Sequence, residues 1–121
     1  GVPFYGYDWT ADRGWPVTWV DIQELIELHE PRVSLLERDS EGEVAESTFT
    51  YRDGEGQHTI WYASRRSLEA KLDLVQEYDL AGIAIWRLGG EDPEYWEAIH
   101  EKLARDPYEV QRSIVRYLPD P

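Results

Sequence analysis

Residues 80–92, which read LAGIAIWRLGGED, are the stretch that decides the fold. Within them, residues 82–88 form a short apolar run that only Arg87 interrupts. A continuous apolar run predicts a strand of a parallel sheet that is buried on both faces. Two glycines then supply a tight exit, and the Asp-Pro-Glu sequence at 92–94 is typical of a helix start. A strand, a glycine turn and a capped helix form one unit of an α/β fold. Such folds bind ligands at the carboxyl ends of their strands, where Trp86 lies.

Composition limits the classes of protein and partner. A chain of 121 residues can form one domain with a core of its own. Its 25 acidic residues outnumber the 12 basic ones and give a formal charge of −13. This charge argues against nucleic acid and anionic membranes as partners, because phosphate recognition needs basic groups. Most of the surplus acid is expected to solubilise the surface. No apolar run approaches the length of a membrane span, and without cysteine the chain has no disulfide or thiol site.

Two features of the composition stand out. The sequence has no methionine and begins inside an expected strand, so we expect it to be a piece of a longer protein. Its six Trp and eight Tyr residues are many for this length. Surfaces rich in aromatic rings suit flat apolar ligands such as sugar faces, although most rings in proteins pack in cores.

The first nine residues, GVPFYGYDW, are expected to form a buried strand. Because side chains alternate along a strand, one face would carry Pro3, Tyr5, Tyr7 and Trp9, and the other Val2, Phe4 and Gly6. The aromatic face is either a wall that leads into a pocket or a layer of the core, and the sequence leaves both possibilities open.

The next segment predicts a compact α+β unit. A capping box of Thr18 and Asp21 begins a helix that should end before Pro31. His29, near its end, is expected to be a cap or surface residue. A strand over 32–36 precedes an acidic stretch, 37–46, which indicates a loop or hairpin tip. A metal site there has weak support because no EF-hand spacing occurs. Two β-rich runs, 47–52 and 57–62, flank Asp53-Gly54-Glu55-Gly56 and predict a hairpin with Phe49 and Tyr51 on one face.

The last part of the chain is predominantly helical. Residues 64–78 predict an amphipathic helix, capped by Ser64 or Ser67, whose apolar stripe is Leu68, Leu72, Val75 and Tyr78. The helix after the second strand, 93–104, should turn inward Trp96, Ile99 and Leu103. A final helix begins at 106 with the stripe Val110, Ile114 and Leu118, and residues 119–121 are typical of a linker.

The order of elements implies two parallel neighbouring strands joined by a right-handed crossover. Residues 1–9 and 64–118 would form two βα units, and residues 10–63 would be an α+β insertion at the carboxyl end of the first strand. Two parallel strands do not form a closed barrel and leave edges exposed. We therefore expect self-association or a shifted packing of the terminal helices.

Three segments together resemble glycoside hydrolase family 18, which contains chitinases and peptidoglycan-directed glucosaminidases of spores. Residues 1–9 resemble the seventh barrel strand of that family, and residues 80–92 resemble its eighth. The segment Ile60-Trp61-Tyr62 and the helix at 67–71 are similar to the end of the family's small insertion domain. The YDW and RLGGED sequences are more similar to bacterial cell-wall-directed or multi-enzyme fusion members of the family than to secreted chitinases. The resemblance implies an α/β fold that is the last part of a (β/α)8 TIM barrel, with the missing N-terminal part of the barrel as a partner.

The same resemblance implies a set of substrate-binding residues. Trp86 corresponds to the tryptophan that forms the floor of the subsite for the reacting N-acetyl sugar, and a flat indole stacks well on a sugar face. Tyr5 matches a tyrosine of the same cleft. Tyr7 stands where many chitinases have arginine, and Asp8 and Trp9 are expected at the rim.

The acid motif of the family, DxxDxDxE, is absent from this sequence. In the family its glutamate protonates the leaving oxygen while the acetamido group of the substrate acts as the nucleophile. Glu91 and Asp92 are expected to serve the turn and the helix cap. We therefore expect no catalytic residue, no metal and no cofactor, and we expect the 121 residues alone to be inactive.

The functional expectation is a C-terminal fragment of a hydrolase of N-acetylglucosamine-containing glycans, of the chitin or peptidoglycan type. The fragment would supply part of the sugar-binding cleft, and the parent would be secreted or associated with the cell envelope. The alternative is a non-catalytic carbohydrate-binding or protein-interaction module.

Overall fold

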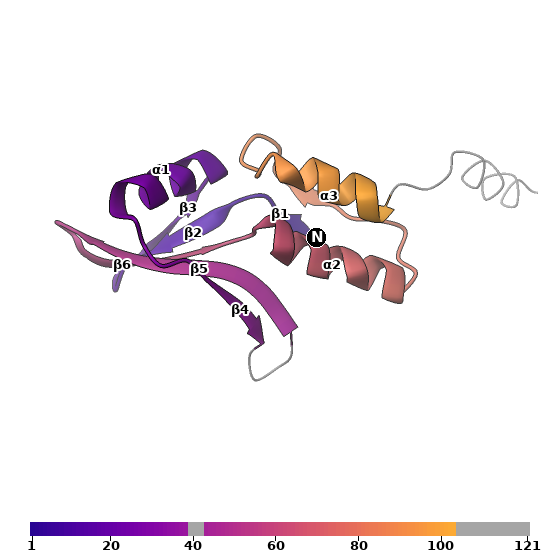
Figure 1. Ribbon diagram of the computed structural model, residues 1–121, viewed down its shortest axis with the longest axis horizontal. Coiled ribbons are helices and arrows are strands. Elements are labelled where there is room, and N and C mark those ends of the chain that lie inside the picture. The colour runs from indigo at the N-terminus through magenta and orange to yellow at the C-terminus, as the bar shows by residue number, and fades with distance from the viewer. Residues whose placement is uncertain (39–42, 104–121) are drawn as a thin grey trace, which may run out of the picture.

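The computed structural model describes residues 1–38 and 43–103 and contains two sheets and three helices within them (Figure 1). The final helix and the linker expected over 106–121 lie outside the described residues. None of the described helices has the length and apolar character that a membrane span requires. The elements in chain order are β1 (Val2–Pro3), β2 (Gly6–Trp9), β3 (Gly14–Val17), α1 (Trp19–His29), β4 (Ser34–Arg38), β5 (Glu43–Asp53), β6 (Gly56–Tyr62), α2 (Arg65–Glu77), β7 (Ile85–Trp86) and α3 (Glu94–Leu103).

The smaller sheet is the predicted parallel pair. Strands β1 and β7 align Val2 with Ile85 and Pro3 with Trp86. The amide of Val2 donates to the carbonyl of Ala84 at 2.8 Å, and that of Phe4 to the carbonyl of Trp86 at 2.8 Å. The prediction that segments some eighty positions apart are parallel neighbours is therefore confirmed.

Strand β7 differs from the prediction in length and burial. It is two residues long, and Trp86 is 69% exposed. Ile83 and Ile85 pack against the core, but Leu88 is exposed. The prediction of burial on both faces is therefore wrong for this chain. Two-sided burial requires a layer on each side of the sheet, and among the described residues only the α2–α3 side has one.

Helices α2 and α3 cover the inner face of the parallel pair. The N-cap of α2 is Ser64, whose hydroxyl accepts from the amide of Ser67. The buried residues of this core are Val2, Phe4, Ala63, Leu68, Leu72, Tyr95 and Ala98.

Two aromatic residues expected in this core lie outside it. Tyr78 is exposed because α2 ends at Glu77, so that Tyr78 is the C-cap and leaves the apolar stripe. In α3 the buried ring is Tyr95, and Trp96 is exposed. The indole N–H of Trp96 donates to Glu91 at 3.2 Å, which holds that ring at the surface.

The larger sheet is antiparallel, with the strand order β3-β2-β6-β5-β4. The strand expected over 1–9 is therefore two strands in two sheets, with a bend between Pro3 and Gly6. Its predicted alternation is confirmed, since Val2, Phe4, Gly6 and Asp8 are buried and the positions between them are not. A Cβ at Gly6 would lie 2.7 Å from Cβ of Tyr62, so β2 and β6 approach closely because this position lacks a side chain.

The predicted hairpin is strands β5 and β6, whose register pairs Asp53 with Gly56. Phe49 and Tyr51 share one face, as predicted, and both are buried in the core beneath α1. Strand β5 begins at Glu43 and pairs with β4, so part of the expected acidic loop is strand. This pairing supports the hairpin interpretation of residues 37–46, whose tip lies outside the described residues.

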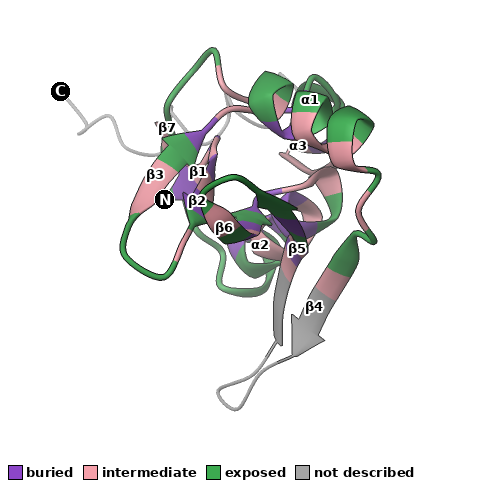
Figure 2. Cartoon of the chain, turned by 90° about the vertical axis from the view of Figure 1, so that its left-hand side faces the viewer, coloured by how far each residue is buried: buried purple, intermediate pink, exposed green. Residues whose placement is uncertain are grey.

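Helix α1 covers one face of the larger sheet (Figures 1 and 2). The predicted capping box is present, with the amide of Thr18 donating to Asp21 at 2.7 Å. The helix ends at His29, and its C-cap Glu30 has a left-handed conformation with φ of 44°, directly before Pro31. Ile22 packs into a second core with the inward residues of β5 and β6. The helix exposes its outer side to solvent (Figure 2).

Candidate functional site

Three aromatic rings form a row along the start of the chain, on the face of the larger sheet that α1 does not cover. The ring centroids of Tyr5 and Tyr7 are 5.8 Å apart, and those of Tyr7 and Trp9 are 5.3 Å apart with an interplanar angle of 23°. Strand pairing aligns Tyr7 with Trp61 of β6. Because Ile60 packs beneath α1, alternation places Trp61 and its partner on the opposite face.

These rings line an open groove of about 390 Å³. It extends from the parallel pair to the antiparallel sheet, because both Pro3 and Trp61 line it. Trp61 was not expected at the site, although its position between two inward residues of an alternating strand was a usable signal. The lining residues are Pro3, Tyr5, Gly6, Tyr7, Trp9, Glu46, Trp61, Tyr62 and Ala63.

The position of Trp9 depends on a neighbouring glycine. Trp9 pairs with Gly14 across β2 and β3, and a Cβ at Gly14 would lie 2.4 Å from the indole ring. The ring therefore lies flat over a position without a side chain. It remains 48% exposed and available for contact with a ligand.

Trp86 lies at the carboxyl end of β7, the strand that pairs with β1, as predicted. Its neighbour across the parallel pair is Pro3, which lines the groove. Its indole is largely exposed, but Trp86 itself is not among the residues that line the groove. The peptide bond that follows it, to Arg87, is cis. A shared trough of Trp86 and Tyr5 stays a prediction.

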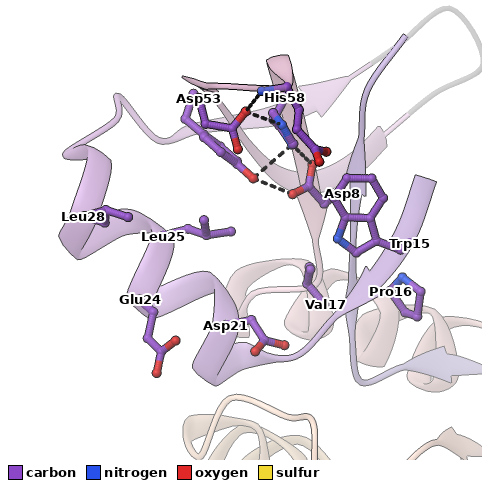
Figure 3. A pocket seen from close by; sticks show the side chains of 12 residues that line it. Asp8, Trp15, Pro16, Val17, Asp21, Glu24, Leu25, Leu28, Asp53 and His58 are labelled. Carbon is purple, nitrogen blue, oxygen red and sulfur yellow. Dashed lines mark hydrogen bonds and ion pairs between the residues drawn. The ribbon is translucent and has the colours of Figure 1, made fainter. Parts of the chain in front are cut away.

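Asp8 lies on the other side of the sheet, which corrects its expected position at the rim. It is 1% exposed and belongs to a buried network (Figure 3). The hydroxyl of Tyr51 donates to Oδ2 of Asp8 at 2.7 Å, and Nδ1 of His58 lies 2.9 Å from Oδ1. Because side chains alternate along β2, Asp8 points away from the face that carries Tyr7 and Trp9.

The network favours the charged form of His58. Nδ1 faces Asp8 and Nε2 lies 3.1 Å from Oδ1 of Asp53. A carboxylate faces each ring nitrogen, and an imidazole donates from both nitrogens only in its charged form. Burial acts to lower the pKa of His58, but the hydrogen bond and charge of Asp8, with those of Asp53, outweigh it and raise that pKa. Burial and the Asp8 hydrogen bond raise the pKa of Tyr51, which keeps its hydroxyl a donor.

A second hollow, of about 480 Å³, lies between this network and α1 (Figure 3). Leu25 and Leu28 of the helix line one side, and Asp53 and His58 of the hairpin line the other. Among residues 1–38 and 43–103, no three His, Asp or Glu side chains are grouped so that they could hold a metal ion.

Glu91 and Asp92 have the structural roles expected of them. Oδ1 of Asp92 accepts from the amide of Glu94 at 2.9 Å and caps α3. Glu91 accepts from the amide of Gly89 at 2.5 Å and so closes the glycine turn. Backbone amides, its own among them, lower the pKa of Glu91, together with the indole of Trp96. A carboxylate stabilised in this way is a poor proton donor.

Comparison with known proteins gives a consistent result. Residues 1–92 match the sequence model of a family described as Glycosyl hydrolases family 18. A cortical fragment-lytic enzyme of Bacillus subtilis (strain 168) is 33% identical over 120 residues, covering 96% of this chain and 26% of that protein. An uncharacterized glycosylase of the same organism is 29% identical over 105 residues, covering 84% of this chain and 29% of that protein.

Solved structures show the same similarity. A chitinase of Chromobacterium violaceum ATCC 12472 superimposes with a TM-score of 0.72 at 34% identity, over 87% of this chain and 32% of that one. The spore cortex-lytic enzyme SleL of Bacillus megaterium QM B1551 gives 0.70 at 28% identity, over 84% and 24%. The chain thus spans about a quarter to a third of the length of the proteins it matches.

Proposed function

The chain belongs to family 18 of the glycosyl hydrolases, and on that premise we propose that it supplies part of the sugar-binding cleft of a hydrolase of N-acetylglucosamine-containing glycans. Its relatives include a chitinase and a cortical fragment-lytic enzyme, whose names support glycans of the chitin or peptidoglycan type. The observation that carries the proposal is the exposed aromatic groove. Indole and phenol rings stack on the apolar faces of sugars, and their polar edges remain free for hydrogen bonds.

Trp86 has a separate role in this proposal, as the floor of the subsite for the reacting N-acetyl sugar. Its exposure at the carboxyl end of a parallel strand supports the role, because α/β folds bind ligands there. Tyr5, Tyr7 and Trp9 would continue the cleft along β2 toward Trp61, and each ring would contact the glycan chain away from the reacting sugar.

The architecture belongs to the proposal as well. Strands β1 and β7 with α2 and α3 would be the last two βα units of a (β/α)8 barrel, and residues 10–63 would be its α+β insertion. The parallel pairing supports the two barrel units. The antiparallel sheet supports a separate α+β unit, but that sheet includes β2, so the unit takes in residues 6–9 as well as 10–63. The exposed side chain of Leu88 would be covered by the rest of such a barrel or by a second copy, while Trp86 would stay open to the sugar.

Binding without hydrolysis is what we expect of the 121 residues alone, because the sequence lacks DxxDxDxE. The test is a titration with the N-acetylglucosamine tetramer, followed by tryptophan fluorescence and by release of reducing ends. A saturable fluorescence change without release of reducing ends is the expected result. Hydrolysis by the pure chain would contradict the expectation that it is inactive. An unchanged fluorescence spectrum at millimolar sugar would contradict the proposal that the groove binds sugar.

A pair of variants assigns the signal to the groove. Trp9→Ala should weaken binding by about 2- to 12-fold, the range that aromatic contacts of about 0.5–1.5 kcal/mol imply. Tyr78→Ala is the matched control, because Tyr78 is an exposed ring that does not line the groove. Equal losses in the two variants would contradict the assignment.

A further inference from the structure

The aromatic groove contains one charged side chain among the described residues that line it, Glu46 of β5. Its carboxylate is held in place, because Nζ of Lys71 on α2 donates to Oε1. The two side chains are only 24% and 27% exposed, so the pair is largely shielded from solvent. Glu46 is therefore a carboxylate on the groove wall that a lysine of α2 holds in place.

The carboxylate of Glu46 can accept further hydrogen bonds besides the one from Lys71. An ionised carboxylate has about four lone-pair sites, and one ammonium group takes one of them. Lys71 does not itself line the groove, so a ligand in the groove meets the carboxylate and not the ammonium group. The surrounding rings offer apolar surface, which weakens the screening of charge by water.

We propose that Glu46 selects the charge class of the glycan. It accepts hydrogen bonds from hydroxyl, N–H or ammonium groups of the sugar, and it repels sugars that carry a free carboxylate. The net charge of −13 adds a field of the same sign. The inference rests on the proposed function of the groove and narrows it. The preferred ligands are neutral N-acetylglucosamine chains and their deacetylated, cationic forms, and the carboxylate of muramic acid is disfavoured at this position.

The experiment separates charge from shape with two ligands that differ only in charge. A muramic-acid-containing tetrasaccharide and its methyl ester have nearly the same shape, but only the acid is anionic. Each is titrated into the whole 121-residue chain at low salt and followed by tryptophan fluorescence, with the N-acetylglucosamine tetramer as reference. We expect the ester to bind more tightly than the acid, by less than about fivefold, because one full charge–charge contact near water is worth about fivefold and Lys71 neutralises part of the carboxylate's charge. High salt should reduce the ratio.

Three variants test the residue. Glu46→Gln should bring the ester-to-acid ratio close to one, and Lys71→Gln should raise it above that of the unmodified chain. Glu27→Gln, on α1 beneath the other face, makes the same change in net charge and should leave the ratio unaltered. Far-ultraviolet circular dichroism checks that each variant is folded, and the opposite directions expected for Glu46 and Lys71 keep the test decisive if one of them unfolds.

The outcomes that count against the proposal are distinct. If the N-acetylglucosamine tetramer does not bind, the sugar-binding groove itself fails. If it binds but the acid and the ester bind equally, or if Glu46→Gln keeps the ratio of the unmodified chain, charge selection by Glu46 is wrong and the groove stands.

Discussion

Replacing His58 by alanine should destabilise the protein more than any surface substitution. His58 is 1% exposed and joins the end of β2, through Asp8, to the hairpin turn, through Asp53. The substitution leaves the carboxylate of Asp8 buried, with the hydroxyl of Tyr51 as its remaining partner in the network. The loss therefore comes from an uncompensated charge and from a cavity where the ring was.

The magnitude follows from the two halves of the network. Breaking a buried ion pair by removing one partner is destabilising by about 3–5 kcal/mol, and the contact with Asp8, whose side chain is 2% exposed, is of this kind. The contact with Asp53 adds little, because that side chain is 38% exposed and screened by water. We expect a loss of about 3–5 kcal/mol from a domain whose total stability is about 5–15 kcal/mol.

Urea unfolding followed by tryptophan fluorescence measures this loss as a shift of the midpoint at constant slope. His100→Ala is the control, since His100 is exposed on α3 and should change the free energy of unfolding by less than about 0.5 kcal/mol. The double variant Asp8→Asn with His58→Gln should recover part of the loss, because it removes both charges. A loss below about 1 kcal/mol for His58→Ala would refute the view that an ionised pair is buried there.

The remaining predictions concern pH, the groove and a helix cap. Because the pKa of His58 is raised in the folded state, the charged ring stabilises the fold fully below the unfolded pKa, and this stabilisation is lost as pH rises through the folded pKa. The free energy of unfolding, measured against pH, should show this decline, and His58→Gln should abolish it. The pKa of Asp53 shifts in the opposite direction: the hydrogen bond from the amide of Glu55, with the charge of His58, lowers its folded pKa. The stabilisation from Asp53 is therefore lost as pH falls through the folded pKa, and Asp53→Asn should flatten the acid side of the plot of unfolding free energy against pH. Gly14→Ala should displace the Trp9 ring and weaken sugar binding by more than twofold, which a sugar titration measures. The free energy of unfolding should change by less than about 1 kcal/mol in a thermal melt, because the exposed ring can rotate outward. Asp92→Ala removes the cap of α3 and should destabilise by about 0.5–2 kcal/mol in the same assay, whereas Glu94→Gln, without a capping bond to lose, should not.

Features that depend on neighbours in the sequence could be predicted. The capping box joins Thr18 and Asp21, three positions apart, and the hairpin turn closes between Asp53 and Gly56. Alternation placed the aromatic row on one face of β2 for the same reason, since the direction of a side chain in a strand depends on its position alone. The parallel pairing of β1 with β7 was inferred from the order of the elements and from the apolar run, not from local bonding.

Only the tertiary structure decided the contacts that depend on strand register and the burial that depends on a second layer. Asp8 meets Tyr51 and His58, 43 and 50 positions away, only because β2 lies beside β6 and β6 beside β5 in one particular alignment. Alternation places the aspartate of the YDW segment opposite its two rings, but nothing within the segment indicates which of the two faces is buried. The sequence by itself determined the elements and their faces, because hydrogen bonds a few residues long and the period of a strand are local properties. Which of those faces were buried, and which distant side chains met, was decided by packing, because burial requires a second layer that no local pattern encodes.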